Sequence, residues 1–221
     1  TPYSEMNSIL KKTQIKMSDH GSLMDIIYIQ NRFNLPALYK DFPNCKSSIG
    51  SNGKDSRLEK NIFEKIPVFT EMGKDIDIRV IGIYNNKRVW RYIPSKYIDT
   101  NHENLGKYKV VLPVANGSGG LGQTLSAPIV EIPNEAYTRS FIGIGAFQTE
   151  SEATSALKYV KTKFARTLLA VLKVTQMNNK DVWQFVPVQD FTDKSDIDWS
   201  KSIHDIDLQL YKKYGLSAEE I

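Results

Sequence analysis

The sequence predicts an α+β fold, in which a twisted and mostly antiparallel sheet packs against one long amphipathic helix and a second helix lies near the C-terminus. Two observations favour this class. Residues 75–147 alternate short β-branched and aromatic runs with turn residues, as antiparallel strands do. After Thr149, apolar residues recur at intervals of three and four, as they do along one face of a helix.

The strands are predicted from composition and from the turns between them. Residues 75–84 and 87–94 are joined by Asn85-Asn86, and asparagine tolerates a positive φ, so we expect a two-residue hairpin turn there. The remaining strands are expected at residues 107–114, 125–133, 140–147 and 182–191, the last with Pro187 near its end.

The helices are predicted from capping residues and apolar spacing. Thr149-x-x-Glu152 is a capping box that opens the long helix. Its apolar face comprises Ala153, Ala156, Leu157, Val160, Phe164, Leu168, Val171 and Leu172. A second helix is expected from about Ser202 to the terminal glycine, Gly215. Ser217-x-x-Glu220 predicts the start of another helix, and with no initiator methionine we expect a fragment of a longer chain.

Residues 1–65 are the least legible part of the chain. Residues 22–38 are apolar enough to be buried as a strand or a short helix, whereas residues 42–57 have the composition of a loop. We expect this N-terminal segment to pack on a main domain of residues 66–221. Cys45, the single cysteine, is interpreted as a free surface thiol in a reducing compartment. No run approaches the roughly 18 apolar residues of a membrane span, so a cytoplasmic protein without a membrane partner is expected.

The segment Gly117–Gly122 matches the dinucleotide pattern G-x-G-x-x-G and follows a predicted strand. A dinucleotide site needs a helix after the third glycine and an acidic residue about 20 positions further on. Here an extended, proline-containing segment follows instead, and no Gly-Lys-Ser/Thr occurs. These observations favour a glycine turn or a close approach to a partner. A self-contained enzyme that binds a nucleotide or S-adenosylmethionine remains the alternative.

Other catalytic or metal-binding patterns are weak. The three histidines, His20, His102 and His204, are scattered, and we interpret His102 and His204 as exposed. The acids around Asp196 and Asp198 lack the glycine and the terminal glutamate of a calcium loop. We therefore expect no catalytic residue, cofactor or metal in this chain.

The net charge of +4 is unevenly distributed. Residues 150–180 carry six basic and two acidic side chains, whereas residues 181–221 carry four and nine. On a continuous helix the cations lie opposite the apolar face, in a row about 22 Å long. Such a row can displace counterions from duplex DNA, although a solvated lysine face is the alternative.

The hairpin places cations among aromatic residues. In strand alternation Arg88, Trp90 and Tyr92 share one side. Arginine beside an aromatic ring can pair with phosphate or read a guanine edge. A place for Trp90 in the core is the competing interpretation, and the one that we favour.

Five blocks of sequence occur in a recognisable order: KRVWRYIPSKYI, NLGKYKVVLPVANGSGGLG, FIGIGAFQTESEATSALKYVKTKFARTLLAVLKVTQ, VWQFVPVQDF and DIDWSKSIHDIDLQLYKKYGLSAEEI. Together they resemble the C-terminal target-recognition region of bacterial type II restriction–modification enzymes that carry adenine-specific DNA methyltransferase activity. The resemblance covers about residues 78–221.

The resemblance implies a sequence-specific module for double-stranded DNA without catalytic activity of its own. The catalytic methyltransferase domain of the same parent chain would be its partner, and there S-adenosylmethionine would methylate a flipped adenine. Some members of this group also cleave DNA. A protein-interaction domain of a restriction complex is the further alternative.

Individual roles follow from side-chain chemistry within the matching blocks. We infer phosphate contacts from Lys158, Lys161, Lys163, Arg166 and Lys173. Base contacts are expected from Arg88, Arg91, Ser118, Gln123 and Gln176. The remaining DNA-binding candidates are Lys87, Lys96 and Asn116.

Overall fold

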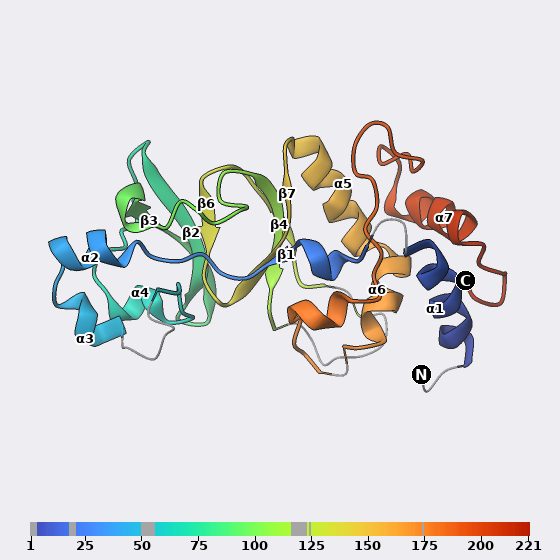
Figure 1. Cartoon of the computed structure of the whole chain (residues 1–221), viewed down its shortest axis with the longest axis horizontal. Helices are drawn as coiled ribbons and strands as arrows, with labels where there is room; N and C mark the ends of the chain where they lie inside the picture. Colours follow the sequence, from blue (N-terminus) through green and yellow to red (C-terminus); the bar gives the residue numbers. More distant parts are fainter. Residues whose placement is uncertain (1–3, 18–20, 50–55, 116–122, 124, 174) are drawn as a thin grey trace.

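The computed structural model describes residues 4–17, 21–49, 56–115, 123, 125–173 and 175–221. Its helices and mostly antiparallel strands confirm the α+β class. The strands form two sheets, one in each of two lobes that lie side by side along the long axis of the molecule (Figure 1). The expectation of a single sheet is therefore wrong.

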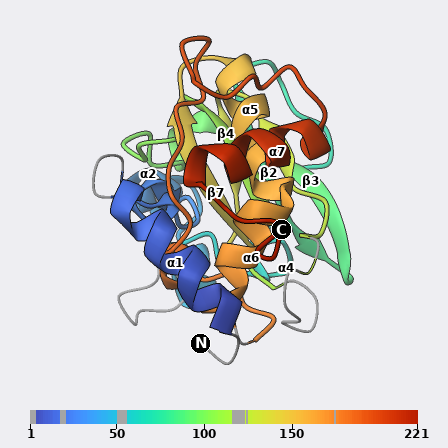
Figure 2. The same cartoon turned by 90° about the vertical axis from the view of Figure 1, so that its right-hand side faces the viewer.

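The large lobe is built on a four-stranded antiparallel sheet of order β1-β7-β4-β5. These strands are β1 (Ile27–Tyr28), β7 (Phe141–Phe147), β4 (Tyr108–Pro113) and β5 (Ile129–Glu131). The helical elements of this lobe are α1 (Ser4–Met17), η1 (Leu23–Ile26), α5 (Glu150–Lys161), α6 (Lys163–Ala170), η3 (Lys180–Trp183) and α7 (Ile203–Tyr214). Figure 2 looks onto this lobe with α1 and α7 in front.

The small lobe contains a three-stranded sheet of order β3-β2-β6. Its strands are β2 (Asp77–Tyr84), β3 (Lys87–Pro94) and β6 (Glu135–Tyr137), of which β2 and β6 run parallel. The helical elements are α2 (Leu35–Asp41), α3 (Cys45–Ile49), α4 (Ile62–Lys65) and η2 (Ser95–Tyr97). The N-terminal segment thus supplies α1, η1 and β1 to the large lobe and α2, α3 and α4 to the small one.

Local capping and turn signals form as the sequence predicts. Asn85 and Asn86 have φ angles of 48° and 59° and join β2 to β3. The Thr149 hydroxyl accepts the Glu152 N–H at the start of α5, and the Glu152 carboxylate accepts the Thr149 N–H. Helix α7 begins after Ser202 and ends at Gly215, whose φ of 64° is left-handed.

The prediction of a single long helix is wrong, because the chain bends at Thr162, between α5 and α6. Thr162 has a ψ of 152° and caps α6 by accepting the Ala165 N–H at 3.1 Å. The Asp207 carboxylate on α7 accepts the Lys163 and Phe164 N–H groups, both at 2.9 Å. A threonine cap and a carboxylate together satisfy backbone donors that a continuous helix would bond internally.

Two further expectations fail near the C-terminus. Residues 182–191 form no strand, since Lys180–Trp183 is a 3₁₀ helix and the Pro187 carbonyl accepts the Tyr159 hydroxyl at 2.8 Å. Pro187 also lacks an N–H for a ladder. The Ser217–Glu220 pattern forms a turn instead of a helix, in which the Ser217 N–H donates to the Glu220 carboxylate.

Each lobe has its own apolar core, and a third cluster joins them. The large-lobe core includes Trp183 and Leu168, and the small-lobe core includes Leu38 and Leu58. The third cluster takes one residue from each of β2, β4, β6 and β7: Ile81, Val111, Tyr137 and Phe141. We call it the seam.

Tyr137 is the polar centre of the seam. Its side chain is fully buried, and its hydroxyl accepts the Asn104 amide N–H at 3.1 Å. Its backbone N–H donates to the Asn31 side chain, and its carbonyl accepts the Asn31 N–H. Burial raises the pKa of the Tyr137 hydroxyl well above its ordinary value, so the group stays neutral. A Cβ at Gly143 would lie 2.3 Å from this hydroxyl, so this position requires glycine.

Gly143→Ala is expected to reduce the free energy of unfolding by about 1–3 kcal/mol, because overpacking displaces Tyr137 or β7. The matched control is Gly106→Ala, where an added Cβ meets nothing within 4 Å. The control is expected to change stability by no more than about 0.5 kcal/mol. Urea unfolding measures both, and equal effects of the two substitutions would contradict this account.

A buried pair of ionisable side chains lies beside the seam. Lys109 on β4 and Glu131 on β5 are fully buried, with Nζ and Oε2 3.8 Å apart. Glu135 on β6 pairs with Arg79 on β2 at 2.7 Å, and the Arg79 guanidinium lies 4.0 Å from the centre of the Trp90 ring. Burial raises the pKa of Glu131 to about 8, an effect that the nearby Lys109 opposes.

Because the pKa of Glu131 is higher in the folded chain than its ordinary value of 4.5, the folded state binds the proton more tightly. The stability from this group is complete below pH 4.5 and is lost as the pH rises toward 8. We expect the unfolding free energy of the wild type, minus that of Glu131→Gln, to fall across this window. Chemical unfolding at several pH values measures it, and a difference independent of pH would refute the assignment.

Candidate nucleic-acid interface

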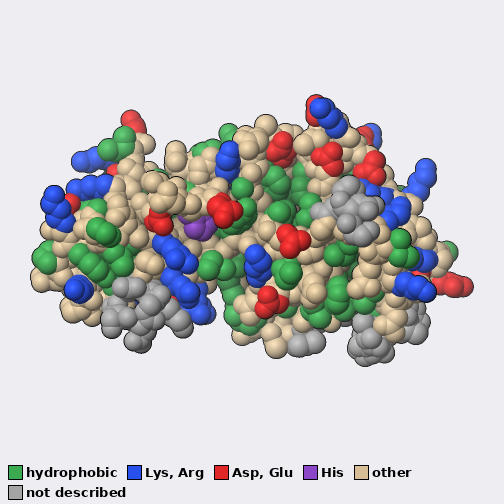
Figure 3. All heavy atoms as spheres, in the orientation of Figure 1, with side chains coloured by type: hydrophobic (Ala, Val, Ile, Leu, Met, Phe, Trp, Pro, Cys, Tyr) green, Lys and Arg blue, Asp and Glu red, His purple; other side chains and the backbone are tan. Residues whose placement is uncertain are grey.

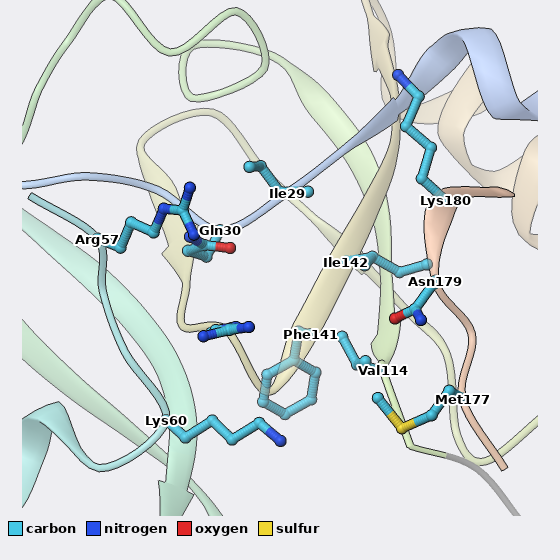
Figure 4. Close-up of a pocket in the computed structure, with 11 residues that line it drawn as sticks. Ile29, Gln30, Arg57, Lys60, Val114, Phe141, Ile142, Met177, Asn179 and Lys180 are labelled. Atoms are coloured by element: carbon cyan, nitrogen blue, oxygen red, sulfur yellow. The ribbon is translucent and has the colours of Figure 1, made fainter. Parts of the chain in front are cut away.

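A cleft lies between the two lobes and holds a cavity of about 230 Å³ (Figure 4). The cleft receives side chains from both lobes and from the link that follows β1. It is lined by Ile29, Gln30, Arg57, Lys60, Val114, Arg139, Phe141, Ile142, Met177, Asn179 and Lys180. Phe141 belongs both to the seam and to the lining of this cavity.

The charge of the cleft is positive. Four of its lining side chains are cationic and none is acidic: Arg57, Lys60, Arg139 and Lys180. Arg139 pairs with Glu59 at 3.2 Å, whereas Arg57, Lys60 and Lys180 form no ion pair with any residue that the structure describes. Figure 3 shows Lys and Arg side chains gathered where the small lobe borders the notch between the lobes. This arrangement favours an anionic ligand.

The wall and floor of the cleft carry hydrogen-bonding and apolar groups. Gln30 is 4% exposed, and its amide nitrogen has no partner among the described residues. Its amide oxygen points toward the cavity (Figure 4). Phe141 also lines the cavity but is only 2% exposed, and Asn179 adds a second carboxamide. The cleft therefore combines positive charge with amide groups.

The hairpin reaches this cleft through Arg88. Its guanidinium lies 5.4 Å from the centre of the Phe141 ring and donates to the Ala127 carbonyl at 2.9 Å. Burial lowers the pKa of Arg88, which remains a cation. Among the predicted base-contact residues, Arg88 thus stands next to a lining residue of the cleft.

The other hairpin cations lie elsewhere in the small lobe. Arg91 pairs with Glu71 at 2.9 Å, and Lys96 pairs with Asp41 at 2.6 Å. Lys87 is exposed beside the turn. Trp90 is half-buried and packs against the seam, as the core interpretation expects.

The predicted row of helix cations does not exist as one outward face. Lys158 Nζ donates to the carbonyls of residues 199–201, at 2.7–3.3 Å. Lys163 Nζ donates to the Ile221 carbonyl, and Arg166 Nε donates to the Lys161 and Thr162 carbonyls. Lys173 is buried, which lowers its pKa. The bend at Thr162 and these internal bonds explain the difference.

The remaining predicted residues are divided between the cleft margin and the glycine segment. Asn116 and Ser118 lie outside the described residues. Gln123 is half-buried. Gln176 is exposed and precedes Met177, which lines the cleft and pairs with Ala115 in a β-bridge. Ala115, the last described residue before the glycine segment, is therefore paired with a residue that lines the cleft.

Sequence patterns missed the four cations of the cleft. Arg57, Lys60, Arg139 and Lys180 come from three separate segments, and none belongs to a periodic run or motif. Isolated basic residues between acidic and apolar neighbours, as in Arg57-Leu-Glu-Lys60, give no signal until the fold brings them together.

Two other residues differ from expectation. Cys45 is 3% exposed in the small-lobe core, which raises its pKa and keeps it a thiol. It is therefore not a surface thiol. His102 is half-buried, with Nε2 3.0 Å from the Ile29 carbonyl, and burial lowers its pKa.

Among the described residues, no group of three or more histidine, cysteine or acidic side chains could hold a metal ion. In the same part of the chain, no helix combines the length and the apolar composition that crossing a bilayer requires. No family model matches the chain, and no curated protein matches it either.

Lys158→Ala is expected to reduce the free energy of unfolding by about 1–2 kcal/mol, because three carbonyls lose a charged donor. Lys87→Ala serves as the control with equal loss of charge, and is expected to stay within about 0.5 kcal/mol of the wild type. Thermal and urea unfolding give the comparison. If Lys158→Ala is as stable as the wild type, the contacts of Lys158 to residues 199–201 contribute nothing to the free energy of unfolding. Lys158 would then again be a candidate for a phosphate contact.

Proposed function

We propose that the chain is a sequence-specific recognition module for double-stranded DNA, and that the interlobe cleft and its rim face the duplex. Four cationic side chains from both lobes line one concave surface, and only Arg139 among them is paired with an acid, Glu59; this is the observation that supports the proposal most strongly. Three of these cations form no ion pair within the described residues, so a phosphate can approach them without breaking protein contacts.

The chemistry of base recognition is available around the same cleft. Arg88 carries a guanidinium, which pairs with a guanine edge, and it lies against Phe141. Gln176 and Asn179 carry exposed carboxamides, which pair with adenine. Phosphate contacts supply affinity and these groups supply discrimination between sequences.

The wider setting follows from the resemblance of residues 78–221 to the target-recognition region of type II restriction–modification adenine methyltransferases. In that setting the module holds a duplex for the methyltransferase domain of the same parent chain. S-adenosylmethionine binds that domain, and the cytoplasm is the compartment in which both act. The module itself needs no cofactor.

The proposal is tested by the salt dependence of duplex binding. The wild-type chain is expected to bind a pool of random-sequence duplexes at low salt. The logarithm of its affinity should fall with the logarithm of salt by about 0.9 per phosphate contact. Lys60→Ala combined with Lys180→Ala should weaken binding and make this slope shallower by about two.

The matched control removes two exposed lysines outside the cleft, Lys194 and Lys212, and is expected to leave the slope nearly unchanged. Fluorescence anisotropy measures all three proteins. The absence of duplex binding by the wild type at low salt would overturn the proposal, and equal effects of the two double variants would remove the cleft from the interface.

A further inference from the structure

We propose that the tip of the β2–β3 hairpin enters the major groove of the duplex, where the carboxamides of Asn85 and Asn86 contact base edges. The tip comprises residues 84–87, which are the two turn residues and the last residue pair of the ladder. The sequence predicts a DNA contact for Lys87, whereas the two asparagines enter that prediction only as turn residues. This inference rests on the proposed function and names residues that determine its specificity.

The hairpin is held at its base, and its tip is uncovered. Eight consecutive residue pairs join β2 to β3. Ile83 and Trp90 pack against the seam, and Arg88 donates to the Ala127 carbonyl at 2.9 Å. Strand β6 pairs with β2 only at residues 79–81, and beyond them no third strand flanks the ribbon among the described residues. The hairpin lies at one side of the molecule in the view of Figure 2. The tip therefore has a fixed direction and an open surface.

The side chains at the tip have no protein partners. Asn85, Asn86 and Lys87 are exposed, and none of their side chains forms a hydrogen bond or an ion pair with a residue that the structure describes. Residues 78–98 contain five basic side chains and no acidic one. The tip thus offers two carboxamides and a cation without breaking protein contacts, and its charge suits the phosphates that border a groove.

The backbone of the turn explains the two asparagines only in part. Asn85 and Asn86 have φ angles of 48° and 59°, and a type I′ turn requires a positive φ at both positions. Glycine adopts such angles without the cost that a Cβ brings, and Asn-Gly and Gly-Gly are common in these turns. Two successive asparagines therefore keep carboxamides where glycine would satisfy the backbone. Exposed amide groups beyond those that the turn needs favour a ligand with donors and acceptors of its own.

The width of the hairpin selects the major groove. Paired strands lie about 4.8 Å apart before their side chains are added, which leaves no room for a ribbon in a minor groove about 6 Å wide. The major groove is about 12 Å wide and admits a two-stranded ribbon. There adenine presents its N6 donor and N7 acceptor, which match the acceptor and donor of one carboxamide. Adenine is therefore the base that Asn85 and Asn86 are expected to read.

The first test compares the double variant Asn85→Gly with Asn86→Gly against a matched control, Asn134→Gly. Asn134 is also exposed and has a φ of 65°, but it lies between β5 and β6. Glycine adopts a positive φ at all three positions, so each variant is expected to fold, which urea unfolding verifies. A preferred duplex is first selected with the wild-type chain from a pool of random-sequence duplexes. The double variant is expected to bind this duplex about tenfold more weakly and the random pool unchanged. The control is expected to bind both as the wild type does.

The second test changes the DNA and leaves the wild-type protein intact. 7-Deazaadenine lacks the N7 acceptor of the major groove, and 3-deazaadenine lacks the N3 acceptor of the minor groove. Each analogue replaces the adenines of the selected duplex one at a time. At one adenine or more, 7-deazaadenine is expected to weaken the wild type about fivefold and to leave the double variant unchanged, whereas 3-deazaadenine changes neither.

Equal binding of the selected duplex by the wild type and the double variant overturns base reading by the tip and leaves the duplex-binding function standing. Weakening by 3-deazaadenine in place of 7-deazaadenine overturns the entry of the tip into the major groove. If the wild type binds no duplex at low salt, or binds duplexes without selecting a sequence, the proposed function fails and this inference fails with it.

Discussion

The relative position of the two lobes depends on the burial of Tyr137 between their sheets. Residues 129–147 run from β5 in the large lobe to β6 in the small lobe and return to β7. Tyr137 stands at the middle of this excursion, where Asn31 and Asn104 satisfy its backbone and its hydroxyl. A neutral phenol with its bonds made in an apolar surround has few alternative positions, because each of them would leave polar groups unpaired. Phe141 and Arg139, which line the cleft, follow Tyr137 within four residues. We therefore expect the packing of Tyr137 to hold this side of the cleft in position.

The sequence predicts those features whose causes lie within a few residues of one another. The Asn85-Asn86 turn, the Thr149 capping box and the Gly215 helix end all form, because each depends on contacts between near neighbours. The long helix fails because its interruption at Thr162 is stabilised by Asp207, which lies 45 residues away on α7. The apolar spacing continues across the break, so periodicity alone cannot reveal it.

The candidate site was harder to predict for the same reason. The dense basic run of residues 158–173 is visible in the sequence, whereas the cations of the cleft are dispersed among unrelated segments. Basic residues that are close together in the sequence need not be close together on the surface of the protein. An anionic ligand is attracted by cations that are close together on the surface. The division of the strands into two sheets creates the concave surface on which Arg57, Lys60, Arg139 and Lys180 meet. No pattern in the sequence marks that division.

The contacts that each cation makes within the protein determine how available it is to a polyanion. Lys158 and Lys163 already donate to protein carbonyls, and each would have to lose those bonds to contact a phosphate. Arg57, Lys60 and Lys180 form no ion pair among the described residues, so they exchange mainly water for phosphate oxygens. Since folding and binding both replace hydrogen bonds instead of creating them from nothing, a cation without protein partners contributes more net binding free energy. We therefore infer that each cation of the cleft contributes more to the free energy of binding a polyanion than each cation of α5 and α6 does. The basic residues of the two helices are nevertheless the ones that stand out in the sequence.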